Sequence, residues 1–289
     1  MHVDSTDLSV DGQKISLLVD EPTASSFRGE VVIAPVFGGT ARSMFAFSRA
    51  FNLNGFRTVR LDFRNHVGNS DGEMADARLS GQVEDVRKVC DAYPDATLLG
   101  VSLSARPAIR AVAQGAPVSG ITLITPVVNL QATLLEVVGK DYCDTDFALL
   151  PESVKVIDYE VNNTFIHDAR AHNLVSFEST LSDLVHAQEL TLVAGDADPW
   201  VSIQDVQQAA AQIARSGTKH GLVEVHAAAH KLNRNPAITM RYVSEAVRDC
   251  LEKRGVDGRK ALVPTFDDLL NAALARTSHP VLAQVPSND

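Results

Sequence analysis

The stretch Ala96-Thr97-Leu98-Leu99-Gly100-Val101-Ser102-Leu103-Ser104-Ala105 is an apolar run that ends in a serine with a small residue two positions away on either side. This pattern is typical of a nucleophile elbow, a sharp strand-to-helix turn that presents a serine hydroxyl. Such a turn has a strained backbone, so the residues flanking the serine must be small, as Gly100 and Ser104 are. Ser104 is the weaker nucleophile candidate because Arg106 would then be a flanking residue. We therefore predict Ser102, in a Gly-x-Ser-x-Ser variant of the commoner Gly-x-Ser-x-Gly.

Strands and helices are expected to alternate on both sides of this elbow. Residues 8–19 read as a hairpin that turns at Asp11-Gly12. The further strands are expected at 31–34, 56–61, 97–101, 121–124, 190–193 and 222–225. The helices are expected at 43–54, 80–93, 103–114, 203–213 and from Asn235-Pro236 to just before Gly255. Repeated strand–helix units of this kind predict an α/β fold whose mostly parallel sheet has helices on both faces.

The composition limits the class of protein. A chain of 289 residues with 45% apolar and 21% charged residues can bury one large core. The sequence has no long apolar run and no signal-peptide pattern, so we expect a cytoplasmic protein without membrane insertion. The three cysteines are widely spaced, which favours reduced thiols and offers no metal-ligand pattern. A net charge of −10 without a basic block argues against nucleic acid as a partner.

An insert of some sixty residues between two expected strands interrupts the alternation. We therefore predict a core of residues 1–126 and 189–255, a lid of residues 127–188 and a C-terminal tail of residues 256–289. The lid contains apolar side chains that either line a pocket for an apolar substrate or pack the lid onto the core. They are Leu134, Leu135, Val137, Val138, Phe147, Leu149, Leu150 and Phe165. In the tail, Phe266, Leu269, Leu270 and Ala273 have helical spacing. They are expected to pack on the core, and the alternative is docking on a partner.

A nucleophilic serine requires a base, and His230 is the best placed of the nine histidines. It follows the last expected strand, at the edge of an open α/β sheet where sites assemble. The other histidines lie in terminal segments, in the insert, before the elbow or beside the last strand: His2, His66, His167, His172, His186, His220, His226 and His279.

The acid that orients this base is expected between the serine and the histidine in the chain, after a buried strand. Gly195-Asp196-Ala197-Asp198-Pro199-Trp200-Val201 fits this position. Asp198 is favoured because Gly195 lets the chain turn out of the sheet and the residues after Asp198 fix its exit, and Asp196 is the alternative.

An oxyanion hole completes such a site with two main-chain N–H groups. Leu103 follows the nucleophile and supplies the first by position. The second is expected from Pro35-Val36-Phe37-Gly38-Gly39, with Phe37 as the donor because proline has no N–H and glycines allow close approach. The alternative is an ordinary glycine turn.

The chain also resembles the acyl transferases of bacterial luminescence, myristoyl-ACP thioesterases of the α/β-hydrolase superfamily. The likeness covers about residues 31–248 and departs from the family at Pro35-Val36, at Pro199 and in most of the insert. Its carriers are Asp62, His66-Val67-Gly68, Ser102-Leu103-Ser104-Ala105-Arg106, Val128-Asn129-Leu130, Thr133-Leu134, Gly139, Asp141-Tyr142, Asp198, Trp200-Val201, His230 and Leu232. The resemblance implies an α/β-hydrolase fold and a triad of Ser102, Asp198 and His230.

We therefore expect a serine-dependent acyl transferase or thioesterase that cleaves acyl-ACP or acyl-CoA through an acyl-Ser102 intermediate, without metal or redox cofactor. Arg42, Arg106 and Arg110 are candidates for docking an acidic acyl carrier protein, or else are solvated helix residues. Two alternatives remain open: a carboxylesterase that acts on small-molecule esters, and a hydrolase scaffold that binds partners without catalysis.

Overall fold

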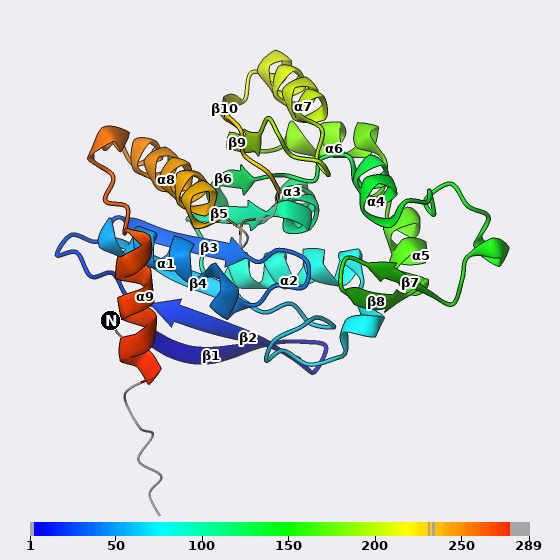
Figure 1. Cartoon of the computed structure of the whole chain (residues 1–289), viewed down its shortest axis with the longest axis horizontal. Helices are drawn as coiled ribbons and strands as arrows, with labels where there is room; N and C mark the ends of the chain where they lie inside the picture. The colour runs from blue at the N-terminus through cyan, green and yellow to red at the C-terminus, as the bar shows by residue number, and fades with distance from the viewer. Residues whose placement is uncertain (1–2, 231, 233–234, 278–289) are drawn as a thin grey trace, which may run out of the picture.

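A central eight-stranded sheet lies between two layers of helices in the computed structural model, which describes residues 3–230, 232 and 235–277 (Figure 1). The strand order is β1-β2-β4-β3-β5-β6-β9-β10. β1 and β2 form the expected hairpin, β2 is also antiparallel to β4, and the remaining neighbours are parallel. The strands of this sheet are β1 (Val3–Val10), β2 (Gln13–Asp20), β3 (Gly29–Ala34), β4 (Phe56–Leu61), β5 (Ala96–Val101), β6 (Val118–Ile124), β9 (Glu189–Gly195) and β10 (Lys219–Val225). The predicted mostly parallel α/β fold is confirmed.

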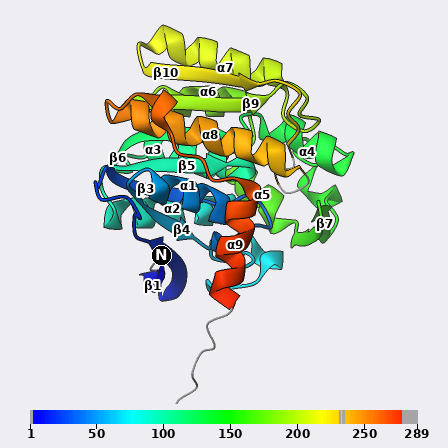
Figure 2. The ribbon, with the colours of Figure 1, turned by 60° about the vertical axis from the view of Figure 1, so that its left-hand side comes forward.

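The two helix layers bury opposite faces of this sheet, as two views show (Figures 1 and 2). Side chains of β3 alternate between the layers: Val31 and Ile33 pack toward α1 and α8, whereas Val32 and Ala34 face the other layer. This two-sided burial explains the uninterrupted apolar runs in the sequence. The first layer contains α1 (Phe45–Leu53) and α8 (Pro236–Lys253), and the second contains α2 (Leu79–Ala92), α3 (Ala105–Ala113), α6 (Phe177–Leu184) and α7 (Ile203–Ser216).

Local sequence signals account for where several helices begin. The 3-10 turn η1 (Ala41–Met44) precedes α1 and is capped by Thr40, and the 3-10 turn η3 (Ser102–Ser104) precedes α3. The Asn235 side chain accepts main-chain hydrogen bonds from the first turn of α8, as its N-cap position predicts.

The insert contains a small hairpin and three helices that extend from one side of the sheet (Figure 1). Its elements are α4 (Leu130–Val138), the turn η4 (Phe147–Leu149), β7 (Ser153–Val156), β8 (Tyr159–Asn162), α5 (Thr164–Ala171) and α6. α6 packs against α3 and α7 beside the sheet, and α5 packs against α2. The Asp168 carboxylate accepts hydrogen bonds from the main-chain N–H (2.8 Å) and hydroxyl (2.5 Å) of Ser80. The last part of the insert is therefore joined to the body of the sheet.

Arg106 and Arg110 fix the loop between α5 and α6 to the helix that follows the elbow. Arg106 is fully buried and donates to the Asp183 carboxylate (2.8 Å) and to the Leu174 carbonyl (3.0 Å). Arg110 donates to the same carboxylate (2.7 Å) and to the Asn173 carbonyl. The expectation that Arg106 is a docking residue or a solvated helix residue is wrong because its side chain is buried. The Arg110 side chain is 20% exposed, and its part in docking stays a prediction. Arg42 is exposed.

The C-terminal segment packs in part, as expected. After the turn η6 (Gly258–Lys260), α9 (Phe266–Thr277) contacts α8, and Leu269 is buried. Phe266 and Leu270 are about half exposed, at 53% and 48%. The side chain of Ala273 lies outside the described residues.

Candidate active site

The turn after β5 has the backbone geometry of a nucleophile elbow. Ser102 has a φ of +59°, a conformation that non-glycine residues seldom adopt, and its side chain is partly exposed. A Cβ on Gly100 would lie 3.0 Å from Leu123 Cδ2 and 3.2 Å from Ala105 Cα, so a larger residue would displace the helix or the next strand. The size restriction inferred from the sequence is therefore present at Gly100.

Ser104 has a structural position in this turn. Its side chain is buried, and its Oγ accepts a hydrogen bond from the Val101 N–H at 2.7 Å. The hydroxyl lies within hydrogen-bonding distance of the Ala34 carbonyl (3.0 Å) and the Val101 carbonyl (2.9 Å). Ser104 thus joins the elbow to the end of β3, and its hydroxyl is enclosed rather than presented at the surface.

The structure brings Ser102, His230 and Asp198 together at the carboxyl ends of the parallel strands. Ser102 Oγ lies 2.6 Å from His230 Nε2, and His230 Nδ1 lies 2.7 Å from Asp198 Oδ2. The side chains of His230 and Asp198 are 6% and 2% exposed. Asp198 Oδ1 accepts main-chain hydrogen bonds from Trp200 (2.9 Å) and Val201 (3.0 Å). Both carboxylate oxygens therefore have partners, and the carboxylate is aligned on the imidazole.

Gly195 is required for a reason that differs from the expected one. A Cβ there would lie 2.1 Å from the Ala228 carbonyl oxygen and 2.4 Å from the Tyr242 hydroxyl. The glycine therefore lets the loop that carries His230 pack against the end of β9. The alternative acid, Asp196, pairs with His226 at 2.7 Å and is not bonded to His230.

The two predicted oxyanion donors lie on neighbouring strands. Ala34 of β3 is paired with Gly100 of β5, so Phe37 and Leu103, each three residues further on, follow adjacent strand ends. The Leu103 N–H is in the first turn of a helix, where main-chain donors have no partner one turn earlier. Across the described residues, no hydrogen bond donated by the Phe37 N–H is found. The role of these two N–H groups stays a prediction.

The loop that carries Phe37 is a hydrogen-bonded turn. The Gly39 N–H donates to the Val36 carbonyl at 2.8 Å, and Gly38 has a φ of +72°, as the third residue of a type II turn requires. The Gly38 N–H donates to His66 Nε2 at 3.0 Å. A glycine turn is thus present, as the alternative interpretation had it, and the same turn carries the Phe37 N–H.

Sequence reasoning assigned no role to His66 and Tyr159, which both contact this turn. His66 is buried after β4, and burial lowers its pKa to about 4, so the imidazole is neutral near pH 7. The sequence did offer one signal for His66, because it is among the residues that carry the family resemblance, as is Asp62. Tyr159 begins β8, in a hairpin that no sequence pattern indicated.

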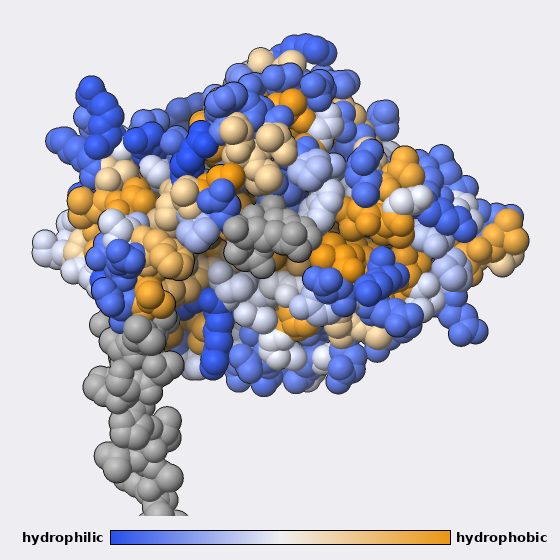
Figure 3. All heavy atoms as spheres, viewed as in Figure 1, coloured by the Kyte–Doolittle hydropathy of each residue, from blue (hydrophilic) through white to orange (hydrophobic). Residues whose placement is uncertain are grey.

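The apolar side chains of the lid differ in burial. Leu134, Leu150 and Phe165 are buried, Val137 and Val138 are half-buried, and Leu135, Phe147 and Leu149 are exposed. Apolar side chains gather over the lid and at its tip on the face in Figure 3. A pocket of about 230 Å³ lies between α4 and the Asp198 loop. The apolar residues singled out in the sequence do not line this pocket, where polar side chains such as Asn129, Glu136 and Asp205 contribute.

Three further features concern the cysteines, the possible metal ligands and the helices in the part of the chain that the structure describes. Cys90, Cys143 and Cys250 are buried free thiols, and burial raises the pKa of each to about 12. The described residues contain no group of three or more His, Cys, Asp or Glu side chains arranged to hold a metal ion. Among the described helices, none combines the length and apolar character needed to cross a membrane.

The sheet topology and the serine at a strand-to-helix elbow define the α/β-hydrolase fold class. The structure is similar to Est1E from Butyrivibrio proteoclasticus with bound ferulic acid, with a TM-score of 0.70 and 18% identity over 86% of this chain and 99% of that one. It is also similar to a monoacylglycerol lipase from Paleococcus ferrophilus, with a TM-score of 0.63 and 15% identity over 82% of this chain and 99% of that one. These likenesses concern the fold.

Within this class, the chain belongs to the acyl transferase family, whose model matches residues 8–274. An acyl transferase of Photobacterium leiognathi is 24% identical over 250 residues, which are 83% of this chain and 78% of that protein. An acyl transferase of Aliivibrio fischeri is 28% identical over 230 residues, which are 75% and 73% of the two chains. The family resemblance inferred from the sequence is confirmed.

Proposed function

We propose that the protein is a serine-dependent acyl transferase or thioesterase that cleaves an acyl thioester through an acyl-Ser102 intermediate. The observation that carries the proposal is a pair of hydrogen bonds that link the three side chains. Ser102 Oγ lies 2.6 Å from His230 Nε2, and His230 Nδ1 lies 2.7 Å from the buried Asp198 carboxylate. Membership of the acyl transferase family supports transfer of an acyl group as the reaction.

In the first half of the proposed reaction, His230 Nε2 takes the proton of Ser102 as Oγ forms a bond to the thioester carbonyl carbon. The N–H groups of Leu103 and Phe37 stabilise the oxyanion of the tetrahedral intermediate. The carbon–sulfur bond then breaks, and the leaving thiolate takes the proton from His230. The acyl group remains on Ser102 as an ester.

In the second half, His230 takes a proton from water or an acceptor alcohol as its oxygen attacks the acyl ester. Collapse of the second intermediate breaks the bond to Ser102 Oγ, which recovers its proton from His230. Asp198 keeps the proton of the neutral imidazole on Nδ1, so that Nε2 is free to accept. It also stabilises the imidazolium that forms in each half.

The test is intact-mass spectrometry of the wild type after mixing with acyl-ACP and acyl-CoA thioesters of graded chain length. We expect an acyl adduct, or faster thioester loss, in the wild type and in a Ser9→Ala control at the exposed outer strand β1. Neither is expected in Ser102→Ala. Comparison of the two thioester series shows whether the carrier protein or the acyl chain is recognised.

Two outcomes would contradict the proposal. Turnover of small-molecule esters without turnover of any thioester would identify a carboxylesterase with the same serine chemistry. Absence of both, together with no labelling of Ser102 by a fluorophosphonate that labels a control hydrolase, would indicate a non-catalytic scaffold.

A further inference from the structure

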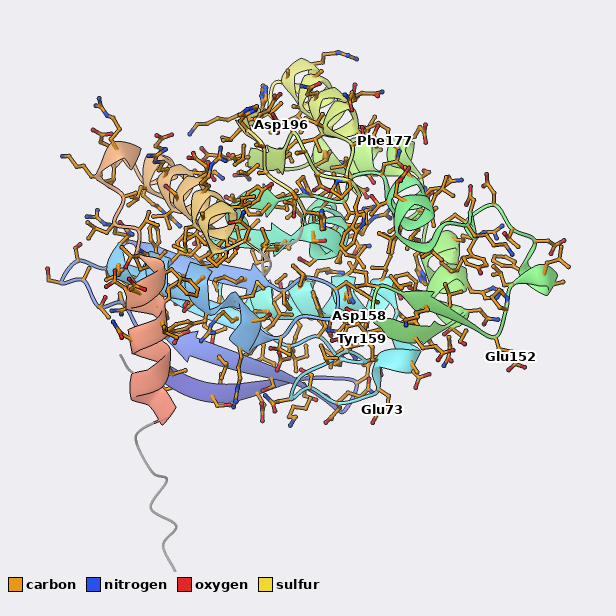
Figure 4. All side chains as sticks on the ribbon, in the orientation of Figure 1. Glu73, Glu152, Asp158, Tyr159, Phe177 and Asp196 are labelled. Atoms are coloured by element: carbon orange, nitrogen blue, oxygen red, sulfur yellow. The ribbon has the colours of Figure 1, made fainter. Side chains whose placement is uncertain are left out.

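The residue next to the proposed oxyanion donor Phe37 is held from two sides by side chains that are distant in sequence. The Gly38 N–H donates to His66 Nε2 at 3.0 Å, and the Gly38 carbonyl accepts from the Tyr159 hydroxyl at 3.1 Å. His66 belongs to the body of the fold, after β4, whereas Tyr159 begins β8 of the lid hairpin (Figure 4). One residue of the turn is therefore bonded to both the body and the lid.

The contact on the body side is enclosed and fixed. His66 is 5% exposed, and its burial lowers the pKa to about 4, so the imidazole is neutral near pH 7. The tautomer with its proton on Nδ1 has the Nε2 lone pair that accepts from the Gly38 N–H. Nearby, the buried Asp62 carboxylate accepts hydrogen bonds from the N–H groups of Ala41 (2.6 Å) and Asn69 (2.9 Å). The segment from Gly38 to Ala41 is thus bonded to the loop that follows β4 at two points.

The contact on the lid side is equally close. A Cβ on Gly38 would lie 2.1 Å from the Tyr159 ring, so the ring occupies the space that any larger residue would need. The Phe37 ring makes edge contacts with Tyr159, His66 and Phe165, at centroid distances of 6.1, 5.6 and 6.1 Å. The lid hairpin therefore packs on the turn as well as bonding to it.

These contacts determine the direction of the Phe37 N–H. That N–H belongs to the Val36–Phe37 peptide, whose carbonyl is bonded inside the turn by the Gly39 N–H. In a planar trans peptide the N–H points opposite to the carbonyl, so it is directed out of the turn. The turn keeps this form only while Gly38 stays at its φ of +72°, and His66 and Tyr159 hold both peptides that flank Gly38.

We propose that Tyr159 and His66 are positioning residues that fix the direction of the Phe37 N–H, the proposed oxyanion donor. Through Tyr159, the alignment of this N–H depends on the lid hairpin being packed against the turn. This inference rests on the proposed function, in which the Phe37 N–H stabilises the acyl-transfer oxyanion. It assigns to the lid hairpin a part in the chemical step.

The decisive variant is Tyr159→Phe, which removes the hydroxyl and keeps the ring. Tyr142→Phe is the matched control, because Tyr142 is a half-buried tyrosine of the same insert. Within the described residues, no hydrogen bond of the Tyr142 hydroxyl is found. We expect kcat to fall about 10-fold in Tyr159→Phe, less than the roughly 10²–10³-fold that follows loss of an oxyanion donor. KM stays within about twofold, because the oxyanion exists only in the transition state.

A transition-state analogue separates positioning from general destabilisation. The affinity of a trifluoromethyl ketone for Tyr159→Phe should fall by the same factor as kcat/KM, while Tyr142→Phe keeps wild-type values. His66→Gln, whose amide oxygen can accept from Gly38, should retain more activity than His66→Leu. The inference would be overturned if Tyr159→Phe lost kcat about 10-fold at an unchanged KM but kept the wild-type affinity for the analogue.

The outcomes also distinguish this inference from the proposed function. The same series is measured with p-nitrophenyl esters, which report acylation of Ser102 whether or not thioesters are substrates. If the protein turned over p-nitrophenyl esters but no thioester, the proposed substrate would be contradicted. The comparison of Tyr159→Phe with the wild type on the esters would still decide the inference. Wild-type activity with an unchanged Tyr159→Phe would overturn the inference alone, and a protein inert to both substrates and to the ketone would overturn both.

Discussion

Two Asp–His pairs form between the same two loops, the one after β9 and the one after β10. Asp198–His230 and Asp196–His226 have the same Nδ1-to-Oδ2 distance, 2.7 Å. Their environments differ: the side chains of the first pair are 2% and 6% exposed, whereas those of the second are 34% and 89% exposed. Figure 4 labels Asp196 near the outer end of the sheet. The two pairs therefore have the same hydrogen-bond distance but very different exposure to water.

The comparison shows that pairs of the same geometry can differ in every other contact. In the buried pair, the imidazole also contacts Ser102, and the carboxylate is fixed by two main-chain N–H groups. In the exposed pair, water competes for both groups, and solvent screens their attraction. The hydrogen bond from His226 lowers the pKa of the Asp196 carboxyl group, and this pair lies at the protein surface.

The largest contrast is expected from the two histidines. His230→Gln should lower kcat/KM for the acyl substrate by about 10⁵-fold, because Ser102 loses its proton acceptor. His226→Gln should leave it within about twofold. Steady-state kinetics with circular dichroism as a folding control checks both variants. A similar loss in both would show that the exposed pair takes part in the reaction.

The two aspartates should differ nearly as much. Asp198→Asn should lower kcat by about 10³–10⁴-fold, since an amide in that place favours the wrong tautomer of His230. Asp196→Asn removes only the exposed partner and should change kcat by less than about threefold. The expectation is checked by pre-steady-state acylation of Ser102, and it would be contradicted if Asp196→Asn were the more damaging substitution.

His66 extends the comparison to a histidine that is as buried as His230 but accepts its hydrogen bond from a main-chain N–H. Burial lowers its pKa from 6.5 to about 4. Between these values the unfolded chain binds a proton that the folded protein does not, so the stability present above pH 6.5 is lost as the pH falls toward 4. The loss is about 1 kcal/mol per pH unit.

Urea unfolding of the wild type and His66→Gln at several pH values in this window measures that effect. The wild type should lose stability more steeply than the variant as the pH falls. Parallel slopes would mean that His66 titrates normally in the folded protein.

The smallest effect is expected from disrupting the exposed pair. Asp196→Ser should shift the thermal midpoint by no more than about 2 °C, and 1 M NaCl should have as little influence on it. Differential scanning calorimetry of the wild type and the variant, with and without 1 M NaCl, measures both shifts of the thermal midpoint. A larger shift would indicate that the Asp196 bond to the Ala227 N–H, at 2.6 Å, holds the His230 loop in place.

Much of the fold and of the site followed from local patterns. The elbow is contained within ten residues, and the histidine and aspartate follow apolar strands, so parallel topology alone brings them to one edge. The two Asp–His pairs, however, have almost the same separation in sequence, 30 and 32 residues. Only tertiary packing gives one of them a serine neighbour and burial.

The rest depended on contacts that sequence spacing does not encode. Arg106 reads as a surface helix residue, yet its Asp183 partner lies 77 residues away across the insert. Tyr159 contacts a turn 121 residues earlier. Gly195 was identified, but the carbonyl that requires it belongs to a loop beyond the next helix. Each of these depends on how the insert and loops pack against the core.

Ser104 has a consequence for engineering of the elbow. Its hydroxyl joins the strand end before Phe37 to the strand end before Leu103, so it acts as a spacer between the two amides proposed to meet in the oxyanion hole. A glycine at this position would restore the commoner motif and remove the spacer. In this chain the ends of β3 and β5 are thus linked by a side chain, so the second serine of Gly-x-Ser-x-Ser is the residue to keep when the elbow is redesigned.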